Sequence, residues 1–121
     1  MNKDNSFISL VNKIDKEEFM KIFSSLEPGQ WFSDRELEIY SFPKNANSLA
    51  GRYLIKKSIT DHLKEEVKGS EIEILNNEFG KPEVLLSSKV RHISELEGIK
   101  KILCSISHSR NIIGGMTVLC Y

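Results

Sequence analysis

The sequence predicts an α+β fold in which an antiparallel sheet packs on one long helix. The longest periodic segment runs from about residue 47 to 67, and its apolar positions line one helical face. Strand-like segments lie before and after it, and short turns join those near the C-terminus, as in antiparallel hairpins. Because 121 residues can bury a core and the chain has no repeat or linker, we expect a single domain, 1–121.

The segment before the long helix is predicted to contain one strand and two helices. Residues 7–11 form an apolar run rich in strand formers. An acceptor side chain followed three residues later by Glu is typical of a helix start, and this spacing occurs at Asp15–Glu18 and at Ser33–Glu36. A turn at 27–30 separates the two helices, and the second is predicted to end near Tyr40.

The segment after the long helix is predicted to be mostly strands. Gly69 is the expected stop of that helix. Residues 70–75 alternate between charged and apolar side chains, as half-buried strands do, and 84–86 return as the partner strand. The charged region beyond gives no clear pattern apart from a short helix at 94–97. Two final strands are predicted at 101–107 and 112–120.

The composition excludes several function classes. Seventeen basic residues balance seventeen acidic ones, so charge gives no support for binding to nucleic acid or to a membrane surface. Cys104 and Cys120 form neither a disulfide framework nor a metal cluster. No apolar run approaches the roughly 20 residues of a membrane span, and the first residues lack the apolar core of a signal peptide. We therefore expect a cytoplasmic protein with no nucleic acid or membrane partner.

Three groups of residues are candidates for phosphate binding. They are a Gly-Lys-Pro turn at 80–82, a Ser-His-Ser sequence at 107–109, and three cations on the long helix, Arg52, Lys56 and Lys57. Each alone is more typical of an ordinary hairpin, a solvated strand end or a solvated helix face. However, hydroxyls beside an imidazole, and lysines, are also competent phosphate partners.

In this order, and with the elements described above, the three groups resemble the holo-acyl-carrier-protein synthase type of 4′-phosphopantetheinyl transferase. The resemblance covers the chain from Phe7 to Cys120. It implies transfer of the phosphopantetheine arm of coenzyme A to a serine of an acyl carrier protein, in fatty acid or polyketide biosynthesis. It also implies coenzyme A as substrate, the carrier protein as partner and a homotrimer.

The resemblance further implies roles for individual residues. Glu38 falls where the family has an acid near the attacking serine or its water, and Lys56 and Lys57 lie in the catalytic segment of the long helix. The residues expected to bind coenzyme A are Arg52, Lys56, Gly80, Lys81, Pro82, Ser107, His108 and Ser109.

The departures from the family pattern concern the metal. The two carboxylates that hold a divalent cation in the family, usually Mg²⁺, are replaced here by Lys13 and Lys57, and like charges repel. Three interpretations follow: Asp15 and Asp61 are displaced ligands, the two ammonium groups bind the pyrophosphate directly, or the protein is a non-catalytic relative that binds coenzyme A or a carrier protein. A subunit that serves only assembly or interaction, without a ligand, is the alternative from a different class.

Overall fold

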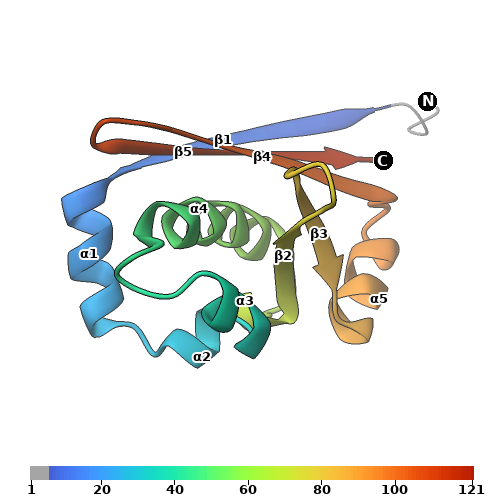
Figure 1. Ribbon diagram of the computed structural model, residues 1–121. Coiled ribbons are helices and arrows are strands. Elements are labelled where there is room, and N and C mark those ends of the chain that lie inside the picture. The colour runs from blue at the N-terminus through green and yellow to red at the C-terminus, as the bar shows by residue number, and fades with distance from the viewer. Residues whose placement is uncertain (1–5) are drawn as a thin grey trace.

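The computed structural model describes residues 6–121 and has the mixed helix and strand order of an α+β fold (Figure 1). The elements are β1 (Phe7–Asp15), α1 (Lys16–Ser25), α2 (Pro28–Trp31), α3 (Asp34–Ile39), α4 (Ala46–His62), the 3₁₀ turn η1 (Gly69–Glu71), β2 (Ile72–Asn76), β3 (Pro82–Leu86), α5 (Ser88–Leu96), β4 (Lys101–Ser109) and β5 (Ile112–Cys120). Within this part of the chain, no helix has both the length and the apolar character needed to cross a membrane.

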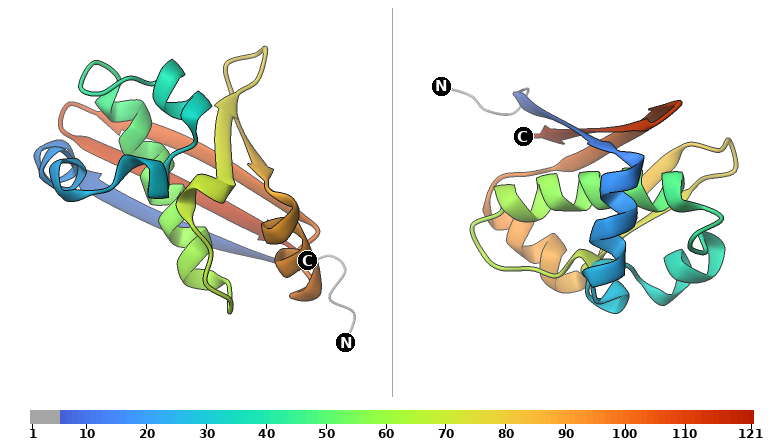
Figure 2. Two further views of the ribbon diagram at one scale, coloured as in Figure 1. Left: turned by 90° about the horizontal axis from the view of Figure 1, so that it is seen from below. Right: turned by 90° about the vertical axis from the view of Figure 1, so that its left-hand side faces the viewer.

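The strands form two antiparallel sheets. One has the order β1-β5-β4, and the other is the hairpin β2-β3. The central strand β5 pairs along its full length with both neighbours, from Cys120 opposite Phe7 and Lys101 to Ile112 opposite Asp15 and Ser109. Figures 1 and 2 show α4 lying across one face of the larger sheet, with no element of residues 6–121 on the other face. The predicted antiparallel sheet on a long helix is confirmed.

Two glycines allow α4 to approach the larger sheet closely. A Cβ atom at Gly51 on α4 would collide with the side chain of Ile106 on β4. A Cβ atom at Gly115 on β5 would lie 3.0 Å from the Cβ of Leu54. The rest of α4 is largely buried between the sheet, α1 and the β2-β3 hairpin, so this helix holds the core together.

The predicted end of the long helix at Val67 is wrong. The helix ends at His62, and Leu63 has extended backbone angles. The Glu97 carboxylate accepts a hydrogen bond from the Lys64 amide at 2.9 Å, which fixes the chain after the helix. Leu63 and Val67 are nevertheless buried in the same core as the helix residues. Their spacing therefore reflects burial of a loop, and Gly69 begins the η1 turn instead of stopping the helix.

Other boundaries differ by smaller amounts. β1 continues from the predicted end at Val11 to Asp15, and the predicted turn at 27–30 overlaps the short helix α2. The largest omission is α5, of which only 94–97 was predicted. Its start is fixed by the Ser87 hydroxyl, which accepts from the Val90 amide at 3.2 Å. Its buried positions, Val90, Ile93 and Ser94, have helical spacing, but only two of them are apolar and most of the rest of the helix is charged or polar.

Candidate functional site

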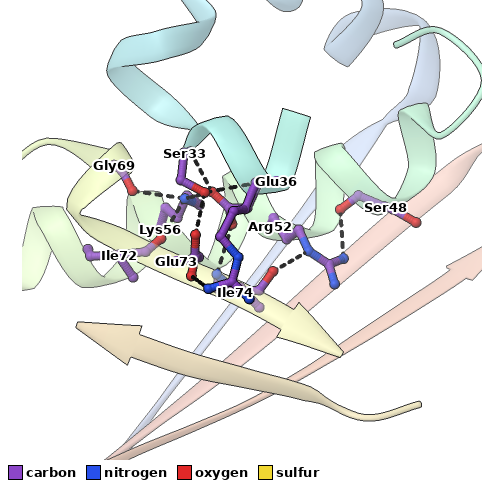
Figure 3. A network of polar contacts seen from close by, with 10 residues as sticks. Ser33, Glu36, Ser48, Arg52, Lys56, Gly69, Ile72, Glu73 and Ile74 are labelled. Atoms are coloured by element: carbon purple, nitrogen blue, oxygen red, sulfur yellow. Dashed lines mark hydrogen bonds and ion pairs between the residues drawn. The ribbon is translucent and has the colours of Figure 1, made fainter. Parts of the chain in front are cut away.

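The long helix carries a lysine whose ammonium group is completely enclosed. Lys56 has no exposed surface, and its Nζ donates to the Glu36 carboxylate at 2.6 Å and to the carbonyls of Gly69 at 2.8 Å and Ile72 (Figure 3). An ammonium group has three N–H donors, and all three are used. Burial lowers the pKa of Lys56 from the ordinary value of 10.5, and the Glu36 carboxylate opposes this shift. The predicted contact of Lys56 with a phosphate is therefore replaced by a structural role.

The partner of Lys56 is Glu36 on α3, a residue that the sequence identified only as part of a helix start. The capping box is present, because the Ser33 amide donates to Glu36 at 2.9 Å and the Ser33 hydroxyl accepts from the Glu36 amide. The other carboxylate oxygen accepts from the Ile74 amide at 2.8 Å. Glu36 thus joins α3, α4 and β2. The predicted acid Glu38 lies on the same helix with its side chain exposed.

Arg52 extends this network by one helical turn. Its Nε donates to the Ile74 carbonyl at 2.8 Å, and its two terminal nitrogens donate to the Ser48 carbonyl and the Asn76 side chain. The guanidinium carbon lies 3.8 Å from the centre of the Tyr40 ring. Only 2% of Arg52 is exposed. The predicted phosphate contact of Arg52 is therefore also replaced by a role in fixing α4 to β2.

Lys57, the next residue along the helix from Lys56, points to solvent. Its Nζ lies 3.4 Å from the Asp61 carboxylate, and 46% of the Lys57 side chain and 65% of the Asp61 side chain are exposed. Exposed pairs of this kind contribute at most about 1 kcal/mol. The ammonium group of Lys57 can therefore exchange Asp61 for a ligand anion at low cost.

The Ser-His-Ser sequence lies at the end of β4. Alternation along the strand places Ser107 and Ser109 on the uncovered sheet face and His108 on the other, and all three are exposed. The register places Lys13 on β1 and Ser107 on β4 on either side of Gly114. A Cβ atom at Gly114 would lie 2.9 Å from the Ser107 hydroxyl. The sheet therefore leaves the space between Lys13 and Ser107 free of any intervening side chain.

The Gly-Lys-Pro turn lies at one end of a groove. Gly80 has a φ of 78°, which glycine adopts without strain, and the Asn77 side chain accepts from the Lys81 amide at 3.0 Å. Lys81 and Pro82 line a groove of about 500 Å³ between β3, α5 and β4, whose lining also includes three more cations, Arg91, Lys100 and Lys101. Neither Lys57 nor His108 is among the residues lining this groove within a single chain.

The residues present do not fit a divalent cation. Lys13 and Lys57 stand at the two positions where the resemblance noted from the sequence leads us to expect carboxylates. Asp15 is engaged as the cap of α1, where one oxygen accepts from the amides of Glu17 at 2.8 Å and Glu18 at 3.4 Å. Asp61 pairs with Lys57. Among residues 6–121, no three His, Cys, Asp or Glu side chains lie together in a way that could hold a metal ion.

No family model matches this chain, but its sequence is similar to those of several holo-[acyl-carrier-protein] synthases. A holo-[acyl-carrier-protein] synthase of Caldanaerobacter subterraneus subsp. tengcongensis is 40% identical over 82 residues, which is 64% of this chain and 65% of that protein, slightly under two thirds of its length. One from Geotalea daltonii is 37% identical over 93 residues, or 73% and 74%. The chain belongs to the holo-[acyl-carrier-protein] synthase family. The resemblance noted from the sequence is confirmed.

Solved structures of holo-[acyl-carrier-protein] synthases share the fold. The Neisseria meningitidis structure has a TM-score of 0.79 at 18% identity and covers 93% of this chain and 97% of that one. The Chronobacterium ammoniagenes structure, a complex with coenzyme A, has a TM-score of 0.78 at 23% identity and covers 96% and 98%. The architecture of the family is therefore retained over nearly the whole chain.

Proposed function

We propose that this protein is a 4′-phosphopantetheinyl transferase that moves the phosphopantetheine arm of coenzyme A to a serine of an acyl carrier protein. The observation that carries the proposal is the identity of 37–40% to holo-[acyl-carrier-protein] synthases. The coenzyme A complex of a structural neighbour supports coenzyme A as the substrate. The two cysteines are free, which is consistent with a reducing compartment, and we propose the cytoplasm as its location.

The reaction needs one nucleophile and one proton acceptor. The serine oxygen of the carrier protein attacks the phosphorus next to the pantetheine arm. A new P–O bond forms, the bond to 3′,5′-ADP breaks, and the serine proton leaves. We propose that exposed Glu38, or a water beside it, accepts this proton. Lys57 and the residues of the two predicted phosphate motifs would bind phosphates, namely Gly80, Lys81, Pro82, Ser107, His108 and Ser109.

The buried network then acts by positioning. Glu36, Lys56 and Arg52 connect α3, α4 and β2 (Figure 3), with Lys56 2.6 Å from Glu36 and with Glu36 and Arg52 each 2.8 Å from the backbone of Ile74. These bonds fix Glu38 on α3 relative to Lys57 on α4 without touching the substrate. Rigid support of this kind keeps catalytic groups in a productive geometry.

We also propose that the protein assembles as a homotrimer through the uncovered face of the larger sheet. This face carries exposed apolar side chains from all three strands: Phe7 (66%), Val11 (75%), Leu103 (46%), Ile112 (43%) and Met116 (41%). Val11 and Met116 lie directly opposite each other in the register. Exposed apolar side chains gathered on one surface are typical of an interaction site, and further copies of the chain would bury them.

The proposed activity is tested with a coenzyme A analogue whose thiol carries a fluorophore. The protein, the analogue and an unmodified acyl carrier protein are incubated together, and the carrier protein is separated and examined for fluorescence. We expect a fluorescent carrier, and no fluorescence when its acceptor serine is replaced by alanine. Binding of coenzyme A without any labelling would instead assign the non-catalytic role.

A further inference from the structure

We propose that the ring of Phe79 stacks on the adenine base of coenzyme A, beside the phosphate contacts given to the Gly-Lys-Pro turn. The inference rests on the proposed function, because coenzyme A is the adenine nucleotide concerned. It adds a residue that contacts the base, at a position that the sequence did not single out.

Phe79 has the largest exposed fraction, 78%, of the large apolar side chains of residues 6–121. It lies in the connection between β2 and β3, which Figure 2 shows projecting beyond the neighbouring elements. The apolar residues of the proposed trimer interface lie on β1, β4 and β5, in the other sheet. The fold therefore leaves the ring uncovered, and it lies outside the set of residues assigned to the assembly.

The backbone of this connection is fixed by Asn77. The Asn77 Oδ1 accepts hydrogen bonds from the amides of Phe79 at 2.9 Å and Lys81 at 3.0 Å. The Asn77 amide donates to the Lys81 carbonyl at 2.7 Å, and the Asn77 carbonyl accepts from the Gly80 amide at 2.9 Å. Because these bonds hold the turn without a ligand, binding does not have to order it, and less affinity is lost.

The turn presents an aromatic ring and a cation at a spacing that suits a nucleotide. Phe79 and Lys81 are two positions apart, and one oxygen binds both of their amides, so their side chains leave the backbone close together. Lys81 is exposed and takes part in no ion pair among residues 6–121. An aromatic ring can stack on the π face of a base, and lysine binds phosphate as a point charge.

The charges on either side of the ring give the ligand a direction. Glu78 precedes Phe79 and is exposed, and its carboxylate would repel a phosphate. Lys81 follows the ring and would attract one. We therefore expect the base over the ring and the phosphates of the nucleotide toward Lys81. An apolar side chain of a protein partner would cover the ring but would leave the ammonium group without an anion.

The inference is tested by calorimetric titration of coenzyme A into the original protein and three variants. We expect Phe79→Ala to weaken binding about tenfold, the effect of losing one stacked base. Phe79→Trp should bind at least as tightly as the original protein, because an indole also stacks on a base. Leu96→Ala removes a side chain that is 73% exposed on α5, and this matched control should leave binding unchanged.

Fluorescence of the Phe79→Trp variant reports the contact itself. Stacking of adenine on the introduced indole should quench its emission, and the quenching should saturate with the dissociation constant found by calorimetry. The chain has a single tryptophan, Trp31, so the same titration of the original protein gives the contribution to subtract.

Three results would overturn the inference. They are coenzyme A binding that Phe79→Ala leaves unchanged, equal weakening by Phe79→Ala and Leu96→Ala, and binding by Phe79→Trp without additional quenching. None of them affects the proposed transfer, which the labelling of a carrier protein tests separately. Absence of coenzyme A binding by the original protein would remove the inference and the proposed substrate together.

Discussion

At the scale of residues, the central feature is a buried ion pair that joins segments far apart in the sequence. Glu36 and Lys56 are both fully buried, with Oε1 and Nζ 2.6 Å apart. Their neighbours satisfy the remaining polar atoms, so the pair links α3, α4, η1 and β2. Burying two charges is costly, and such a pair is tolerated only where every donor and acceptor is used.

Removing one member of this pair should destabilise the fold strongly. We expect Glu36→Ala to lower the free energy of unfolding by about 3–5 kcal/mol, since Lys56 is left as an unpaired buried cation. Urea denaturation measures the change. Glu38→Ala, on the same helix but exposed, is the control and should change stability by no more than about 0.5 kcal/mol. Equal effects of the two substitutions would show that the pair does not support the fold.

For the buried network, the sequence predicted the positions of Arg52 and Lys56 but not the contacts that they make. Arg52 and Lys56 were correctly placed on the long helix, yet both were assigned to phosphate contact. The acid that pairs with Lys56 lies 20 positions away on α3, and the carbonyl that accepts from Arg52 Nε lies 22 positions away on β2. Helical spacing cannot show that such a distant acid is buried beside a lysine. Lys57 has an exposed side chain, and its predicted contact with a phosphate stays a prediction.

At the scale of elements, α4 depends on close contact with the sheet. Gly51→Ala should lower the free energy of unfolding by about 1–3 kcal/mol, because the new methyl group would collide with Ile106 in a packed core. Gly29→Ala is the matched control, since a Cβ atom there meets nothing within 4 Å. Thermal unfolding of both variants measures the difference. A Gly51→Ala protein as stable as the control would show that the contact relaxes freely.

Helices and strands were predicted correctly where residues close in the sequence define their ends. The capping residues Asp15 and Ser33 do open α1 and α3. β5 has the predicted bounds of 112–120. The errors concern elements whose bounds depend on contacts between residues far apart in the sequence. Apolar spacing beyond residue 62 comes from a buried loop, and α5 buries only two apolar side chains, Val90 and Ile93, among its charged and polar residues.

At the scale of the whole molecule, the exposed apolar sheet face predicts the assembly. We expect light scattering coupled to size exclusion to give a mass about three times the 13.8 kDa of one chain. The double variant Val11→Glu and Met116→Glu should be monomeric, because the two carboxylates would be buried in the middle of the uncovered sheet face. Phe79→Glu replaces an equally exposed apolar side chain in the β2-β3 connection and should leave the trimer intact. An original protein that elutes as a monomer would contradict this assembly.

The whole-molecule account combines a retained family fold with an altered site. The fold and the similarity to holo-[acyl-carrier-protein] synthases support the proposed transfer from coenzyme A, whereas Lys13 and Lys57 stand where metal ligands were expected. We therefore propose that the protein keeps the family's transferase activity although the expected metal ligands are replaced.

The most direct test is the intact mass of an acyl carrier protein after incubation with this protein and coenzyme A. The account predicts a mass gain equal to one phosphopantetheine arm, with release of 3′,5′-ADP. An unchanged carrier mass, with Mg²⁺ as well as with EDTA and with coenzyme A binding verified, would contradict it.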